Sequence, residues 1–207
     1  MKRNKLAFGV GINDTDCVTQ ESASEGKRIC PYYSRWRALL LRCYDSKMHD
    51  KHPSYRDCRV CDDWLVFSKF REWMKSQNWE GNSLDKDLLV RGNKLYSPET
   101  CLFIPQSLNA MINGNLTTGV HKEGDSHRSI IFIVGSGGRK KCRRKTKESV
   151  YGWRANIIYQ NLCIISNNYD LSPKVEKMVE FYKFKLLKAL ALDYYDFDLW
   201  DCTSQGF

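Results

Sequence analysis

No stretch of this sequence approaches the ~20 consecutive apolar residues that a bilayer-spanning helix needs. The longest candidate, residues 157–165, is interrupted by Gln160 and Asn161. The N-terminal residues 1–5 are basic, but no long apolar segment follows them, so the sequence predicts no secretory signal. These absences lead us to expect a soluble, intracellular protein that has no membrane partner.

A regular cysteine framework is absent as well. The nine cysteines are an odd number and follow no repeating spacing, so in a reducing compartment we expect free thiols or metal ligands rather than disulfides. The sequence also lacks internal repeats and low-complexity blocks. Its 207 residues, 42% of them hydrophobic and 13% aromatic, predict a folded chain with one domain or two small ones.

Negative charge is in the minority. The formal net charge is +9 and the sequence pI is about 9.1. Such an excess of positive charge favours a polyanionic partner, most simply nucleic acid. A basic enzyme that acts on something else is the alternative, and charge alone does not decide between them.

The hydrophobic pattern predicts an α+β fold. Helical spacing of apolar residues is found in 31–44, 62–77, 105–112 and 147–165, and again from 173 onward. Residues 1–30 are expected to form an arm and 46–57 a loop, while 84–104 is expected to form a short ribbon and loop. The apolar run 130–134 ends at four turn-forming residues, 135–138, which predicts a hairpin. We expect the aromatic residues of 62–77 to form core rather than stack on bases.

The segment 84–109 holds the residues with the clearest chemistry. A one-metal phosphodiesterase needs a carboxylate and a second oxygen ligand for Mg²⁺, a base that activates water, and a polar group that orients the base. Asp85 and Asn109 could supply the two ligands if the ribbon packs on the helix that carries Asn109. Lys86 then lies near the nucleophile, and Thr100 lies at the orienting position. The alternative is a surface turn in which Asp85 and Lys86 only form ion pairs.

The segment resembles the HNH (ββα-metal) endonucleases. The similarity rests on Leu84–Asp87, Gly92–Lys94 and Ser97–Cys101. Together with Tyr33–Tyr44 and Val60–Phe67, these stretches are similar to a group of bacteriophage HNH-like proteins. Many members of that group carry an AP2-like DNA-binding region after the nuclease motif.

The resemblance implies a domain order and a location. We expect an N-terminal arm at 1–30, a ββα-metal module with flanking helices at 31–113, a basic AP2-like sheet and helix module at 114–192, and an acidic, aromatic tail at 193–207. The location implied is the cytoplasm of an infected bacterial host.

Two positions depart from the family pattern. The family's Asp-His pair falls on Asp85 and Lys86, its middle Asn on Thr100, and its last helix ligand on Asn109. The metal ligands are chemically intact, whereas a lysine is protonated at neutral pH and serves better to bind phosphate than to accept a proton. The resemblance therefore implies a Mg²⁺- or Mn²⁺-dependent hydrolase that nicks or cleaves double-stranded DNA, or a scaffold that only binds DNA. The alternative from another class is an inactive scaffold that binds and inhibits a host or phage protein.

Cysteine spacing allows a structural zinc site. Cys58 and Cys61 are separated by two residues, as in a zinc knuckle, and Cys43 and Cys101 could complete four ligands. Two histidines, at 49 and 52, compete as ligands. The alternative is that these cysteines are small buried residues beside the aromatic helix.

The basic residues of the C-terminal half are the predicted DNA contacts. In a sheet that enters a major groove, side chains such as Arg128, Arg139, Lys141 and Arg143 would contact phosphates and base edges. The full predicted set is Arg128, Arg139, Lys140, Lys141, Arg143, Arg144 and Lys145. The alternative is a solvated basic loop that contributes only salt-sensitive, non-specific affinity. The tail at 193–207 would suit a protein partner or could fold back on a basic face.

Overall fold

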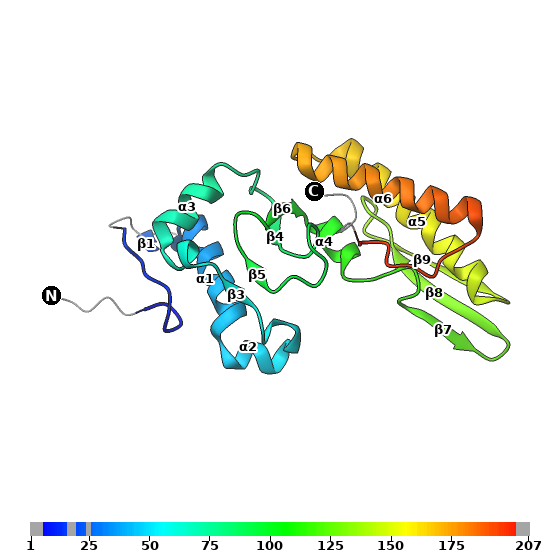
Figure 1. Ribbon diagram of the computed structural model, residues 1–207, viewed down its shortest axis with the longest axis horizontal. Helices are drawn as coiled ribbons and strands as arrows, with labels where there is room; N and C mark the ends of the chain where they lie inside the picture. Colours follow the sequence, from blue (N-terminus) through cyan, green and yellow to red (C-terminus); the bar gives the residue numbers. More distant parts are fainter. Residues whose placement is uncertain (1–5, 16–19, 24–25, 202–207) are drawn as a thin grey trace. The chain divides into compact units, whose positions relative to one another are not determined.

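The computed structural model describes residues 6–15, 20–23 and 26–201 (Figure 1). The basic N-terminal segment 1–5 and the last part of the expected tail, 202–207, lie outside the described residues. The chain divides into two compact units, one built from residues up to 79 and from 92–102, the other from 80–91 and from 103 onward. The expected ββα module at 31–113 is therefore shared between both units. The elements are mixed α and β, and none of the described helices is long and apolar enough to cross a membrane.

The first unit is mainly helical, with two small pairs of strands. Strands β1 (Gln20–Ala23) and β2 (Gly26–Ile29) pair antiparallel, and β3 (Arg59–Val60) pairs in parallel with β5 (Leu95–Tyr96). The helices are α1 (Pro31–Tyr44), α2 (Ser46–Lys51) and α3 (Phe67–Lys75), with 3₁₀ turns η1 (Pro53–Tyr55) and η2 (Asp62–Leu65).

Helix α1 has the bounds that the sequence predicts, whereas the predicted loop at 46–57 and the predicted helix at 62–77 need correction. The segment expected to be a loop contains α2, because the Asp45 carboxylate accepts a hydrogen bond from the Met48 backbone N–H at 2.8 Å and caps a short helix. The helix expected at 62–77 is interrupted at Val66, which is extended and forms a parallel bridge with Ile12. That bridge ends η2 and lets α3 start separately at Phe67.

The core of the first unit is aromatic, as the sequence predicts. Trp36, Trp64 and Phe67 are almost completely buried. The indole N–H of Trp36 donates to the carbonyl of Trp64 at 2.7 Å, so the polar atom of this buried side chain has a partner. Phe70 meets Trp64 edge-on, with ring centroids 5.2 Å apart. These rings hold α1 and α3 together and are not available for stacking on bases.

Residues 11–14, expected to belong to an irregular arm, are joined to this core by backbone and side-chain hydrogen bonds. The backbone of Ile12 exchanges hydrogen bonds with Leu65 and Phe67, and the Asp14 carboxylate accepts from the backbone N–H and hydroxyl of Ser68 at the start of α3. Gly11 lies so close to the ring of Trp36 that a Cβ atom would come within 2.9 Å of it. Glycine is needed there for close approach.

The second unit contains a sheet covered by two long helices. Its elements are β4 (Asn82–Asp85), β6 (Leu102–Pro105), α4 (Gln106–Ile112), β7 (Val120–Glu123), β8 (Ser126–Phe132), β9 (Arg139–Arg144), α5 (Lys147–Asn168) and α6 (Pro173–Leu192). Strands β4 and β6 form one pair, and β7, β8 and β9 form an antiparallel sheet in that order. Helix α5 packs on β8 and β9, and α6 packs on α5 (Figure 1).

Local signals explain why the sheet and its helix form. Residues 124 and 125 make a two-residue turn between β7 and β8, and Gly124 has a φ of 58°, a left-handed conformation that favours glycine. The Thr146 hydroxyl accepts from the backbone N–H of Ser149 and caps α5. The hairpin predicted at 135–138 is a different one: it joins β8 to β9, and it is confirmed by their antiparallel pairing. The predicted cap at Thr146 and the helix after it are confirmed too, and α5 continues to Asn168.

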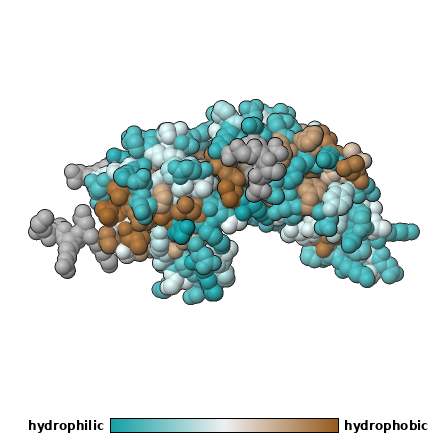
Figure 2. All heavy atoms as spheres, viewed as in Figure 1, coloured by the Kyte–Doolittle hydropathy of each residue, from teal (hydrophilic) through white to brown (hydrophobic). Residues whose placement is uncertain are grey.

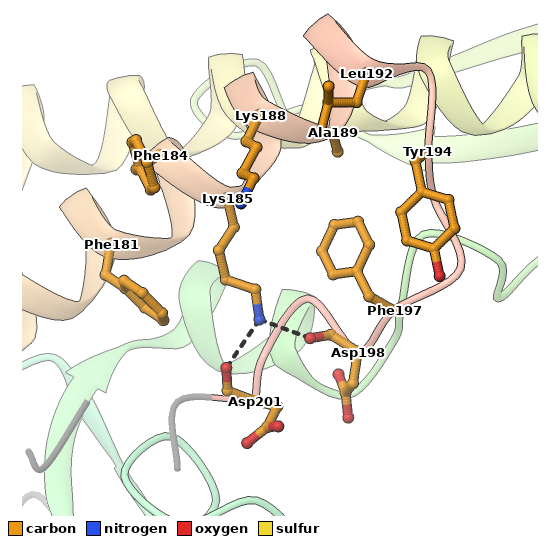
Figure 3. A pocket seen from close by; sticks show the side chains of 10 residues that line it. All are labelled: Phe181, Phe184, Lys185, Lys188, Ala189, Leu192, Tyr194, Phe197, Asp198 and Asp201. Atoms are coloured by element: carbon orange, nitrogen blue, oxygen red, sulfur yellow. Dashed lines mark hydrogen bonds between the residues drawn. The ribbon is translucent and has the colours of Figure 1, made fainter. Parts of the chain in front are cut away.

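The described part of the tail folds back onto the second unit. Leu199 and Trp200 are buried, and the Tyr182 hydroxyl lies 3.2 Å from the carbonyl oxygens of both Leu88 and Trp200. Figure 3 shows Lys185 of α6 donating to the carbonyls of Asp198 and Asp201, each at 2.8 Å. The tail is thus held by its apolar residues as well as by a cation. A groove of about 470 Å³ lies beside it.

Candidate nucleic-acid interface

The register of the sheet gathers basic residues on one of its faces. Directly paired residues of antiparallel strands point to the same face, and side chains alternate along each strand. Arg128 pairs with Arg143, and two positions along β9 the same face carries Lys141 and then Arg139. All four side chains are exposed. We call this surface the outer face; it consists of His121, Glu123, Ser126, Arg128, Ile130, Phe132, Arg139, Lys141 and Arg143.

The opposite, inner face is covered by α5. Ser129 and Cys142 form a directly paired, buried couple on this face. Because they lie one residue away from the outer-face positions, their burial fixes which side of the sheet is free. On the view in Figure 2 the surface over β7, β8 and β9, at the lower right, is largely hydrophilic.

One carboxylate lies among the cations of the outer face. An oxygen of Glu123, at the end of β7, lies 3.9 Å from Nε of Arg128 and 3.8 Å from Nε of Arg143. All three side chains are about half exposed. At that exposure the ion pairs contribute little to stability, on the order of 0–1 kcal/mol. Their effect is to hold the two guanidinium groups beside each other.

Two buried polar residues of α5 fix the position of β8 beneath this face. Arg154 is only 7% exposed; its Nε donates to the carbonyl of Leu116 at 2.7 Å, and an Nη donates to the hydroxyl of Ser129 at 2.6 Å. Burial lowers the pKa of its guanidinium below the ordinary value. Asn161, 1% exposed, accepts from the N–H of Val134 at 3.0 Å and donates to the carbonyl of Phe132 at 2.9 Å.

The site residues predicted from the sequence do not include Arg154, Asn161 or Glu123. The first two lie seven residues apart and so on one face of the helix. That face is otherwise apolar. Two polar residues in such positions are a signal for buried hydrogen bonds to a neighbouring element. For Glu123 the signal was an acid, with Asp125 as its only acidic neighbour, in strands whose other charges are positive.

Three of the predicted DNA contacts do not belong to the outer face. Lys140 pairs with Ile131 and Arg144 pairs with His127, which places both one residue out of phase with the outer-face positions. Lys145 follows the end of β9. All three are exposed. They can raise the local positive potential, but only four of the seven predicted contacts share one surface.

The Asp85 loop is built differently from an open metal site. Asp85 ends β4 and is buried, and one carboxylate oxygen accepts from the backbone N–H groups of Asp87 at 2.8 Å and Leu88 at 2.7 Å. Burial raises the pKa of this carboxyl to about 6. Lys86 is buried too, and its ammonium donates to both carboxylate oxygens of Asp87, at 2.8 and 2.9 Å. The two residues are therefore not a surface ion pair with each other.

Asn109 and Thr100 lie on separate elements. Asn109 is half-buried in the middle of α4, the helix that packs against β4. Thr100 belongs to the first unit, where its hydroxyl donates to the carbonyl of Leu95 at 2.7 Å and accepts from the N–H of Ser97 at 3.2 Å. Thr100 thus has a structural task, holding the turn between β5 and β6.

The four cysteines of the proposed zinc site all belong to the first unit. Cys43, Cys58 and Cys101 are buried, and Cys61 is half-buried at the start of η2. Among residues 6–15, 20–23 and 26–201, no group of three or more His, Cys, Asp or Glu side chains is arranged to hold a metal ion. Burial is what small apolar residues would also show, and the zinc site stays a prediction.

The outer face is thus the surface whose geometry best fits a polyanion. It presents four exposed cations, one carboxylate and two apolar side chains on a sheet that helix α5 holds through buried hydrogen bonds. Comparison with known proteins adds no further assignment: no protein-family model, no curated protein and no solved structure matches this chain.

Proposed function

We propose that this protein binds double-stranded DNA with the outer face of its three-stranded sheet in the major groove. The observation that carries the proposal is the register that aligns Arg128 with Arg143 and brings Lys141 and Arg139 onto the same face. A B-DNA major groove is about 12 Å wide and admits a two-stranded ribbon. The β8–β9 hairpin is such a ribbon, and the net charge of +9 supports the same partner.

The side chains of this face suit both kinds of contact that a DNA-binding protein makes. Arginine and lysine bind phosphate oxygens. The two N–H groups of an arginine guanidinium can also donate together to the acceptor edge of guanine. Glu123, placed between two arginines, is an acceptor for the amino group of cytosine. Contacts to phosphate would position the sheet, and contacts from its central residues would discriminate between bases.

Salt dependence of binding tests the proposal. Each phosphate neutralised by a lysine or arginine steepens the plot of log K against log salt by about 0.9. Alanine at Arg139 or Lys141 should weaken binding and reduce that slope by roughly one. Lys174→Ala, which removes an exposed cation at the start of α6, is the matched control and should change neither quantity. A slope close to zero in the parent protein would contradict the proposal.

Metal-dependent cleavage is the second candidate function. What favours it is the order strand, strand, helix, with Asp85 at the end of β4 and Asn109 in the helix that packs on β4. One carboxylate and one amide oxygen suit Mg²⁺, which keeps several waters and uses few protein ligands. When bound, such an ion would supply positive charge to a phosphate, and Asp85 would hold it. The buried, hydrogen-bonded state of Asp85 weighs against easy access.

A plasmid assay tests the second candidate. Supercoiled DNA with Mg²⁺ or Mn²⁺ should yield nicked circles, and Asp85→Ala and Asn109→Ala should each abolish the product. Asp50→Ala, at an exposed acid of α2, is the control and should leave the rate unchanged. Absence of cleavage with either metal would leave DNA binding as the function.

A protein-binding role remains the proposal from another class. It is favoured by the groove in Figure 3, whose wall includes the exposed side chains of Phe184, Leu192 and Tyr194. If the protein acts only by binding a protein partner in that groove, Phe184→Ser abolishes the binding, whereas Lys141→Ala leaves it unchanged. The reverse pattern supports the outer face as the functional surface.

A further inference from the structure

Two apolar side chains stand in the middle of the basic outer face. Ile130 and Phe132 lie two residues apart on β8, the central strand, and are 41% and 45% exposed. In the register, Ile130 is opposite Lys141 and Phe132 is opposite Arg139. Arg128 precedes them on the same strand. Along β8 the face therefore passes from one cation to two apolar groups, and it carries cations along the facing strand β9.

These two positions are held firmly from behind. The carbonyl of Phe132 accepts the side-chain amide of Asn161 at 2.9 Å, and the Ser129 hydroxyl accepts from Arg154 at 2.6 Å. Both hydrogen bonds come from buried residues of α5. The backbone that carries Ile130 and Phe132 is thus tied at its two ends, and the side chains project from a fixed strand.

Major-groove chemistry supplies one matching group. The edges of the base pairs present hydrogen-bond donors and acceptors, and the only apolar group among them is the C5 methyl of thymine. A pyrimidine methylated at C5 offers the same group. The cations beside Ile130 and Phe132 match the phosphates that border the groove. An apolar protein partner would leave these cations without counter-charges.

We propose that Ile130 and Phe132 contact pyrimidine C5-methyl groups, so that the protein prefers duplex DNA that carries these methyl groups in the major groove. The inference rests on the proposed DNA-binding function and names the substrate feature that the outer face reads. Lysine and arginine position the sheet, whereas the two apolar side chains discriminate thymine from a pyrimidine that lacks the methyl group.

Replacement of thymine by uracil isolates this contact. A short duplex obtained by selection from a random pool is synthesised with thymine and, separately, with deoxyuridine at every thymine position. The two duplexes have the same hydrogen-bonding edges and differ only in methyl groups. We expect the uracil duplex to bind about fourfold more weakly for each contacted methyl, from ~0.8 kcal/mol per buried carbon and 1.4 kcal/mol per tenfold.

Variants assign the effect to the two side chains. Ile130→Ala and Phe132→Ala should bring the ratio of the two dissociation constants towards one. Arg139→Ala should weaken binding to both duplexes and keep their ratio. Leu187→Ala, which removes a 48% exposed apolar side chain from α6, is the matched control and should change neither affinity. Ile130→Thr keeps the β-branched shape and so serves if the alanine variant folds poorly.

Each outcome separates the inference from the function beneath it. Equal, salt-dependent binding of both duplexes overturns the methyl contact and leaves DNA binding intact. Failure to bind either duplex overturns the proposed function itself. Tighter binding to the single strand than to the duplex, lost in Phe132→Ala but not in Ile130→Ala, would identify base stacking by one ring and would also overturn the inference.

Discussion

Asp85 and Arg154 are both buried ionisable residues, but their surroundings give them different roles. The Asp85 carboxylate accepts two backbone N–H groups of its own turn, and burial raises its pKa to about 6. Arg154 of α5 donates to the carbonyl of Leu116, in the segment before β7, and to the hydroxyl of Ser129 in β8. Asp85 shapes a loop, whereas Arg154 joins three separate pieces of the second unit.

The raised pKa of Asp85 predicts a pH effect on stability. Because the folded protein holds the proton more tightly than the unfolded chain, the folded state binds more protons between pH 3.8 and about 6. Stability relative to a variant that does not titrate should therefore fall as the pH rises through this window, by about 3 kcal/mol. Urea unfolding of the parent and of Asp85→Asn, in buffers that contain a chelator, measures the difference.

The side-chain carbonyl of asparagine can still accept the two N–H groups, which keeps the loop intact. Asp50→Asn, at an exposed position of α2, is the control for general effects of charge. A difference between the parent and Asp85→Asn that stays constant from pH 4 to pH 7 would contradict the burial argument.

At the scale of elements, the helices that begin at a local signal could be predicted from the sequence. Features that depend on contacts between distant residues could not. Helix α1 begins at Pro31 and helix α5 follows the Thr146 cap, because proline and a capping hydroxyl act within one turn of chain. The interruption at Val66 depends on Ile12, far away in sequence, and no periodicity could reveal it. Helix α2 also has a local signal in the sequence, its capping residue Asp45, but the helix is short.

The candidate site shows the same division. A strand pattern identified the β8–β9 hairpin, but a shift of pairing by one residue would exchange the two faces of β9. For that reason the strand pattern alone does not separate Lys141 and Arg143 from Lys140 and Arg144. The register separates them, and the buried pair of Ser129 and Cys142 explains why this register is stable.

Close packing between the first described segment and α1 makes Gly11 sensitive to substitution. In Gly11→Ala the added methyl would meet the rings and methyl groups of Trp36 and Leu40, both fully buried. Overpacking of this kind costs about 1–3 kcal/mol. Gly114→Ala is the control, since its Cβ would have no neighbour nearer than 3.8 Å. Equal urea midpoints for the two variants would argue against this packing.

At the scale of the whole molecule, each unit has a hydrophobic core of its own. Trp36 is buried in the first core and Trp200 in the second, where its ring meets that of Tyr182 edge-on at 4.9 Å. Burial of a tryptophan side chain stabilises a protein by about 3–5 kcal/mol relative to alanine. The tail residue Trp200 is therefore as important to its unit as a helix residue is to the other.

Hydrogen exchange should resolve the two cores. Trp200→Ala should speed exchange of the amides in α5, α6 and the β7–β9 sheet, while those of α1 and α3 stay protected. Trp36→Ala should give the opposite pattern. Peptide-level mass spectrometry measures both variants side by side. Uniform loss of protection in either variant would mean that the units unfold as a single cooperative body.

The interleaving of the two units along the chain has a consequence for synthesis on the ribosome. The first unit lacks β5, the partner of β3, until residues 95 and 96 have emerged. The second unit begins at residue 80, but Leu88 and Arg91 wait for Tyr182 and Asp198, which are made far later. The ribosome adds about 5–20 residues per second. The apolar residues 88–90 would therefore emerge seconds before the residues of the core that covers them.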